Sequence, residues 1–290
     1  MKGDADVKLM FRRPRHFMVD YYEIIIGTGM FMLLVIGAIC DHGCREVPDS
    51  ISLPFLFLGI FGTFLHGRYI CGCAVSIIYI LFNHDIKPKF FQKLNKKMMA
   101  RAYGEDEIVV AEEESAINER SDQFFAAHES VLQKVTGATF LLTVGVATIC
   151  AWVDALSSHS NLAKPGVLTA IFIFIIWAHS KVEKPHEPVQ VEHEELRSIG
   201  GADVIYLLGI LAFLGLFRAI YAITAIFIAI LIIILARKLI LRLKGQPPER
   251  SVPLIFYFAW VAPIGYLASA TIGMATADIY SNFSFVFTLI

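Results

Sequence analysis

The chain has 290 residues and a formal net charge of −1, and 56% of its residues are hydrophobic. A soluble domain of this length rarely has so apolar a composition, because polar side chains must cover its surface. The mean hydropathy of +0.62 and the grouping of apolar residues into runs therefore predict an all-α, polytopic integral membrane protein. The near-neutral charge gives no indication of a nucleic-acid partner.

The N-terminal segment, residues 1–23, is polar and basic and lacks a small-residue cleavage site of the secretory type. We therefore expect the apolar run that follows, 24–40, to remain in the protein as a membrane span. Seven further apolar segments lie at 53–65, 69–82, 135–156, 166–180, 203–220, 221–243 and 253–275. A helix needs about 20 residues to cross the hydrocarbon, so segments 53–65 and 69–82 could also form one long helix interrupted at 66–68.

Positively charged residues distinguish these two topologies, because lysine and arginine accumulate in cytoplasmic loops. Eight spans with an outer N-terminus place 17 of the 25 Lys and Arg residues in inner loops. Merging the two short segments would instead put the basic stretches 87–101 and 237–244 on opposite sides of the membrane. We therefore predict about eight spans, and this topology leaves the basic residues of the N-terminal segment outside.

Two charged loops face the cytoplasm in this topology, residues 83–134 and residues 183–202. The first loop begins basic, and its basic half is expected to form an amphipathic helix on the inner leaflet or a solvated loop that contains a helix. In the first case the lipid-facing residues are Phe90, Phe91, Leu94 and Met98. The five cysteines of the chain form no C-x-x-C pair, so we expect neither a zinc site nor another metal or cofactor.

Two aspartates lie at the inner ends of predicted spans. Asp41 ends the first span, and Asp203 begins the sixth, ahead of a long apolar stretch. Ionisable residues are costly at such positions, which makes them candidates for function. Two carboxyls within hydrogen-bond reach share one proton, so that one takes a proton from water while the other polarises a peptide carbonyl. Spacing alone leaves a second interpretation open, in which both aspartates are solvated helix ends.

The residues around each aspartate form a motif. The stretch CDHGCREVPDSISLP has an arginine four positions and a proline seven positions after Asp41, namely Arg45 and Pro48. It resembles the first motif of the type IV prepilin peptidases, a family that includes the archaeal preflagellin peptidases. The stretch GGADVIYLLGIL, which contains Asp203, is similar to the family's second motif, Gly-x-Gly-Asp, and residues 249–267 resemble its last span.

This resemblance implies a multi-pass aspartic endopeptidase of the cell membrane, with Asp41 and Asp203 as its catalytic pair. Its partners would be prepilin- or preflagellin-like precursors with type III (pilin-like) signal peptides, cleaved at the cytoplasmic face of the bilayer to release short basic leaders. The supporting or substrate-binding residues would be Arg45, Pro48, Gly200 and Gly201, and the two glycines would let the segment before Asp203 move. The chain resembles the archaeal branch of the family in its lack of C-x-x-C pairs. Members of that branch are not expected to N-methylate their product.

The chain departs from the family pattern at three points. The motif's second glycine is Ala202, and Ile205 stands where a lysine often follows Asp-Val. The two aspartates also lie farther apart than in the family, which we attribute to an insert formed by the 83–134 loop and a transmembrane hairpin at 135–182. The expected organisation is a six-helix core, residues 24–82 and 203–290, plus this hairpin.

Several other polar residues and glycines have simpler interpretations. Asp85 and Asp154 are expected to be solvated ends of helices. His186 and His193 match no familiar metal-site spacing and are expected in a solvated loop. Positions of close helix packing are predicted at Gly59, Gly62, Gly209 and Gly215.

Two further functions stay open from the sequence. A presenilin-like intramembrane protease would use the same chemistry, but the Tyr-Asp and Pro-Ala-Leu motifs of that class are missing. A non-enzymatic scaffold or transporter would tolerate asparagine in place of the two aspartates. We find no inverted repeat, which tells against a transporter.

Overall fold

The computed structural model describes residues 21–45, 47–66, 69–83, 107–157, 162–182, 201–245 and 253–282. These residues form eight helices and no strand, which confirms the predicted all-α class for this part of the chain. The helices are α2 (Tyr21–Cys44), α3 (Asp49–Leu65), α4 (Tyr69–Asn83), α6 (Glu107–Ser157), α7 (Ala163–Val182), α8 (Gly201–Leu214), α9 (Leu216–Leu243) and α10 (Leu254–Asn282). The proposed amphipathic stretch, Asp85, His186, His193 and Gly200 lie outside the described residues.

Four described helical stretches are long and apolar enough to cross a membrane. They are Tyr21–Cys44, Ser115–Ser157, Arg218–Leu243 and Leu254–Thr271. Shorter apolar stretches lie within the other helices, at Asp49–Leu65, Ile70–Leu81, Pro165–Phe174 and Ala202–Leu214. The outer faces of the long helices expose large apolar side chains such as Leu142, Trp260 and Leu267, as expected for surfaces in contact with lipid. The fold is therefore compatible with a multi-pass membrane protein.

The two short segments near the N-terminus form two helices rather than one. α3 ends at Leu65, and α4 begins at Tyr69. A Cβ added to Gly72 would collide with the side chain of Thr63. In one continuous helix these two residues would be about 13 Å apart along the axis, so the chain must reverse between them. The alternative of a single helix through 66–68 is wrong.

The predicted border between segments 203–220 and 221–243 is wrong, because the helix breaks five residues earlier. α8 ends at Leu214, and Gly215 has a φ of 75° before α9 begins. A residue with a side chain pays a steric cost in this left-handed region, which glycine avoids. Gly215 is therefore a turn residue rather than the packing position that we expected.

The predicted hairpin is joined to its preceding loop by one long helix. α6 begins at Glu107, so residues 107–134, expected as part of a charged loop, are helical and continue directly into the predicted span. α7 packs back on α6, with the indole N–H of Trp152 donating to the hydroxyl of Thr169 at 2.8 Å. α6 also packs against α2, where a Cβ on Gly29 would collide with Thr143. α6 is thus part of the central packing, and α7 packs against α6.

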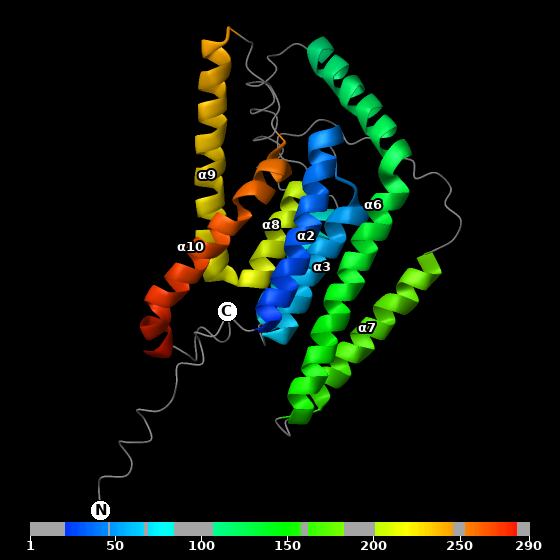
Figure 1. The fold of residues 1–290 in the computed structure, drawn as a ribbon, viewed down its shortest axis with the longest axis vertical. Coiled ribbons are helices and arrows are strands. Elements are labelled where there is room, and N and C mark those ends of the chain that lie inside the picture. The colour runs from blue at the N-terminus through cyan, green and yellow to red at the C-terminus, as the bar shows by residue number, and fades with distance from the viewer. Residues whose placement is uncertain are drawn as a thin grey trace, which may run out of the picture.

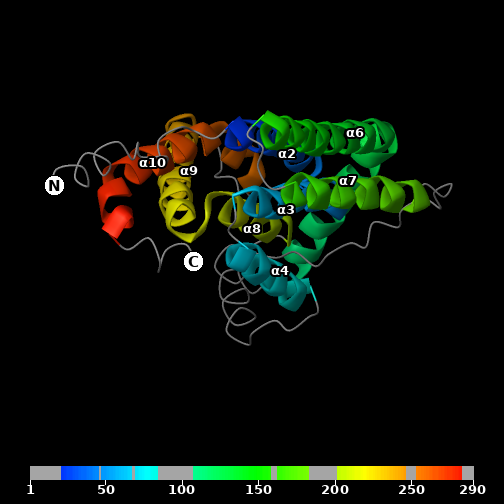
Figure 2. The same ribbon diagram turned by 90° about the horizontal axis from the view of Figure 1, so that it is seen from below.

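The helices surround α2 and α3. Seen from below, α9 and α10 lie on one side and α6 and α7 on the other, with α2, α3 and α8 between them (Figure 2). α3 and α8 approach most closely at two predicted packing glycines, because a Cβ on Gly59 would meet the backbone of Gly209. α2 and α8 run in opposite directions (Figure 1), so the C-terminal end of α2 and the N-terminal end of α8 share one end of the bundle.

Candidate functional site

Asp41 lies in the last turn of α2 and is buried, with 7% of its surface exposed. Its Oδ2 atom accepts a hydrogen bond from the backbone N–H of Phe256 at 3.0 Å. Phe256 is the third residue of α10, and the first N–H groups of a helix have no partner within that helix. Asp41 therefore caps α10 from a neighbouring helix, where the helix dipole favours negative charge. It is not a solvated helix end.

The turn after Asp41 is shaped by the two motif residues Arg45 and Pro48. Arg45 has a φ of 65°, and its N–H donates to the carbonyl of Asp41 at 3.1 Å, which closes the end of α2. Pro48 is the N-cap residue of α3, and its carbonyl accepts hydrogen bonds from Ile51 and Ser52. The side chain of Arg45 interacts electrostatically with Asp41, and its buried Nη1 atom has no hydrogen-bond partner. Arg45 thus combines a strained backbone with a positive charge that acts on the Asp41 carboxyl.

Asp203 is the third residue of α8, which begins at Gly201, and its side chain is half-buried. One turn further on, Tyr206 is 1% exposed and donates from its hydroxyl to the carbonyl of Leu33 at 3.5 Å. This hydroxyl occupies the place where a Cβ on Gly37 would sit. Tyr206 therefore joins α8 to α2 at a position where only glycine leaves room.

The contact between Gly37 and Tyr206 fixes the register of the two aspartates. Asp41 follows Gly37 by four residues, and Asp203 precedes Tyr206 by three, so each lies about one turn from this contact. Because α2 and α8 are antiparallel, both turns extend toward the same end of the bundle (Figure 1). Tyr206 interacts electrostatically with both Asp41 and Asp203. The structure thus brings both predicted residues to one region of the protein.

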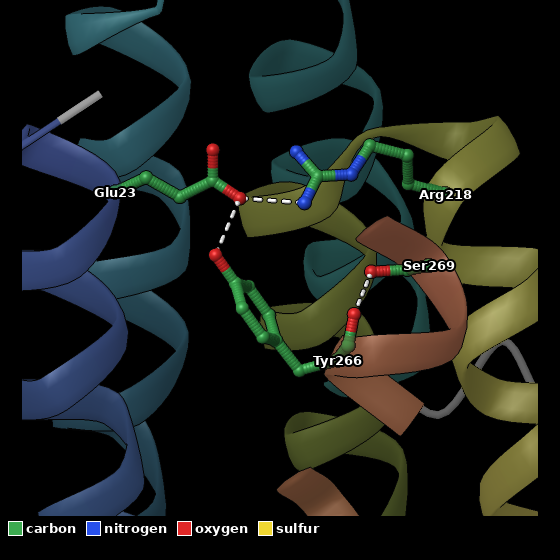
Figure 3. A network of polar contacts seen from close by, with 4 residues as sticks. All are labelled: Glu23, Arg218, Tyr266 and Ser269. Atoms are coloured by element: carbon green, nitrogen blue, oxygen red, sulfur yellow. Dashed lines mark hydrogen bonds and ion pairs between the residues drawn. The ribbon is translucent and has the colours of Figure 1, made fainter. Parts of the chain in front are cut away.

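A second polar cluster is formed by Glu23, Arg218 and Tyr266 (Figure 3). It lies toward the opposite end of α2 from Asp41, because Glu23 is the third residue of that helix. The Nη2 atom of Arg218 donates to Oε1 of Glu23 at 2.6 Å, and the Tyr266 hydroxyl donates to the same oxygen at 3.2 Å. The Glu23 side chain is 11% exposed and that of Arg218 25%. The Ser269 hydroxyl donates to the carbonyl of Tyr266 at 2.8 Å. The cluster ties α2 to α9 and α10.

The sequence reasoning missed this second cluster, although one indication was present. Arg218 is a charged residue within the apolar stretch that follows Asp203, and Glu23 stands directly before the first apolar run. Charged residues placed in this way are candidates for pairing with each other. Nothing in the sequence shows that these two meet, because 195 positions separate them.

Of the other polar residues considered in the sequence, Asp154 lies in the part of the chain that the structure describes. Asp154 is exposed near the end of α6, as expected. Among the described residues, no group of three or more His, Cys, Asp or Glu side chains is placed to hold a metal ion. The five cysteines are free thiols.

The chain matches no protein-family model, and no curated protein or solved structure is significantly similar to it. An assignment of function therefore depends on the two aspartates, their surroundings and the motif residues around them.

Proposed function

We propose that this chain is a membrane-embedded aspartic endopeptidase whose catalytic residues are Asp41 and Asp203. The observation that carries the proposal is the burial of Asp41 at the end of the bundle where Asp203 also lies, with Tyr206 as a shared electrostatic neighbour. One carboxyl takes a proton from the attacking water, and the other donates a hydrogen bond to the scissile carbonyl. The motifs around both residues favour prepilin- or preflagellin-like precursors as substrates, from which short basic leaders are removed.

The proposed topology has eight spans, with the aspartates at the cytoplasmic face of the cell membrane. The C-terminal end of α9 lies at the same end of the bundle as the C-terminal end of α2 (Figure 1). It carries Arg237, Lys238, Arg242 and Lys244. Arg237 donates a hydrogen bond to the hydroxyl of Tyr257, the neighbour of the residue that binds Asp41. A basic helix end beside the aspartates supports a cytoplasmic site, because positive charge accumulates on that side.

The hydrogen bond to Phe256 also favours a second candidate, a non-enzymatic scaffold in which Asp41 only fastens α10 to α2. Asparagine distinguishes the two, since its carbonyl oxygen still accepts a hydrogen bond from the Phe256 N–H but cannot take a proton from water. A scaffold therefore tolerates Asp41→Asn, whereas a peptidase does not.

The test is cleavage of a panel of pilin-like precursors by the protein reconstituted into lipid vesicles. Asp41→Asn and Asp203→Asn are compared with Asp49→Asn, which changes an exposed aspartate in the first turn of α3. We expect product from the wild type and from the Asp49 variant, and none from the other two. If no precursor is cleaved by the wild type, or if all variants cleave alike, the peptidase assignment is wrong.

A further inference from the structure

An apolar cavity of about 370 Å³ lies beside the second polar cluster, between α2, α8, α9 and α10. On α2 its wall follows one helical face, marked by Glu23, Gly27, Phe31 and Leu34. At 1.5 Å per residue, this strip is about 16 Å long, so the cavity is elongated along the helix axis. Its shape suits a long, thin occupant.

The cavity results from the divergence of α2 and α10. The two helices meet where Asp41 binds the start of α10, and they separate toward the end that carries Glu23 (Figure 1). Ala262 and Pro263 form the α10 wall, and proline inside a helix favours a bend. The cavity therefore follows from the directions of the two helices.

The cavity opens toward the lipid-facing surface of the bundle. Ile24 and Phe31 line the cavity, and 56% and 38% of their surfaces are exposed. Both lie in an apolar span, so the exposed surface around the opening is one that would face lipid. Thr28, between them on the same helix, also lines the cavity and is exposed. An occupant can therefore enter sideways from the bilayer, where hydrocarbon chains are the most abundant apolar molecules.

Glu23 and Tyr266 line the cavity at its polar end, and Arg218 reaches the Glu23 carboxylate from α9 (Figure 3). Glu23 is the third residue of α2 and Arg218 the third of α9, so both lie where their spans begin. In a membrane crossed by these helices, the ends of the spans would lie at the depth of the lipid headgroups, and a cavity extending from there along α2 would follow the direction of an acyl chain.

Among the described residues, the cluster at this end of the cavity holds one carboxylate and one guanidinium, which favours one class of headgroup. A zwitterionic headgroup carries a phosphate and an ammonium, and these complement the guanidinium of Arg218 and the carboxylate of Glu23 respectively. The Arg218 side chain is 25% exposed, and its buried Nε atom has no hydrogen-bond partner. An anionic headgroup would lack a cation to face Glu23.

We propose that this cavity binds a phospholipid with a zwitterionic headgroup, with one acyl chain along the α2 face from Gly27 to Leu34 and the headgroup at the Glu23–Arg218 pair. The bound lipid belongs to the leaflet at the Glu23 end of α2, and Asp41 lies toward the other leaflet. Its binding does not depend on peptidase activity.

Native mass spectrometry after exchange into vesicles of equal phosphatidylethanolamine and phosphatidylglycerol tests the proposal. The probe variant is Thr28→Trp, which fills the cavity from an exposed position. The matched control is Met32→Trp, which places the same side chain at an exposed α2 residue outside the cavity lining. We expect one retained phosphatidylethanolamine on the wild type and the control, and a roughly tenfold loss on Thr28→Trp.

A second variant tests the headgroup. Glu23→Gln with Arg218→Gln removes both charges together, so neither is left buried alone. We expect this double variant to retain the two lipids equally. Equal retention on Thr28→Trp and Met32→Trp would overturn the cavity assignment, and a wild-type preference for phosphatidylglycerol would overturn the headgroup assignment. If Thr28→Trp does not fold, Ala262→Phe fills the cavity from α10 and decides the same question.

Discussion

The Asp41 carboxylate accepts a hydrogen bond from the backbone N–H of Phe256, with 3.0 Å between Oδ2 and the nitrogen. The two residues are 215 positions apart in the sequence. This contact joins the end of α2 to the start of α10, while the hydrogen bond between Tyr266 and Glu23 joins the two helices near the other end of α2. The Asp41 carboxylate is thus both a structural cap and the proposed catalytic group. Its two roles are separable by the choice of substitution.

The cap predicts a difference between two variants of Asp41. Asp41→Ala removes the acceptor and leaves the Phe256 N–H without its partner, so we expect a loss of about 1–2 kcal/mol in the free energy of unfolding. Asp41→Asn keeps an acceptor oxygen and is expected to lose less than half of that. Thermal unfolding in detergent measures both, with Asp154→Ala as an exposed control that should change stability little. Equal losses for the alanine and asparagine variants would contradict a capping role.

The ion pair between Glu23 and Arg218 predicts strong coupling in a double-mutant cycle. Either single substitution, Glu23→Gln or Arg218→Gln, leaves the other charge poorly solvated, since the side chains are 11% and 25% exposed. We expect each to cost about 1–3 kcal/mol of stability, less than for a fully buried pair because of the remaining exposure. The double variant should be more stable than the sum of the two losses implies. Additive losses would show that the pair contributes little.

The close fit of Gly37 and Tyr206 predicts a rescue. Gly37→Ala places a methyl group where the Tyr206 hydroxyl lies, so we expect a loss of about 1–3 kcal/mol through overpacking. Tyr206→Phe removes that hydroxyl and should restore part of the stability in the double variant. Gly166→Ala in α7 is the control, because a Cβ there meets nothing within 4 Å, and it should be neutral or slightly stabilising. If the double variant is no more stable than Gly37→Ala alone, the added methyl group does not collide with the Tyr206 hydroxyl.

Much of the helical framework follows from the sequence, because apolar runs and charged loops define membrane helices with few alternatives. The separation of α3 from α4 is an example, since the distribution of basic residues already favours it. The break at Gly215 could not be located, because the residues on both sides are equally apolar and glycine permits a turn without requiring one. The start of α6 at Glu107 was missed because the first turns of this helix are polar and have no apolar run to reveal them.

The sequence predicts Asp41 and Asp203 as candidate residues, but it does not predict their contacts. Asp41 and Asp203 stand out because each interrupts or borders an apolar segment. The partner of Asp41 is a backbone N–H of α10, which carries no sequence signature. Glu23 and Arg218 likewise meet only through the packing of α2 against α9 and α10. Contacts of this range depend on the tertiary arrangement, which local patterns do not specify.

Arg45 allows the conformational and chemical roles of the first motif to be tested separately. Its φ of 65° costs a residue with a side chain about 1 kcal/mol, which glycine does not pay. Arg45→Gly should therefore keep or raise the unfolding temperature. The same change removes the positive charge that acts on Asp41, so cleavage by the proposed peptidase should fall at least severalfold. Arg45→Lys keeps the positive charge and the strained backbone. It should therefore be more active but less stable than Arg45→Gly. If Arg45→Gly cleaves precursor like the wild type, Arg45 only shapes the turn and plays no part in the chemistry.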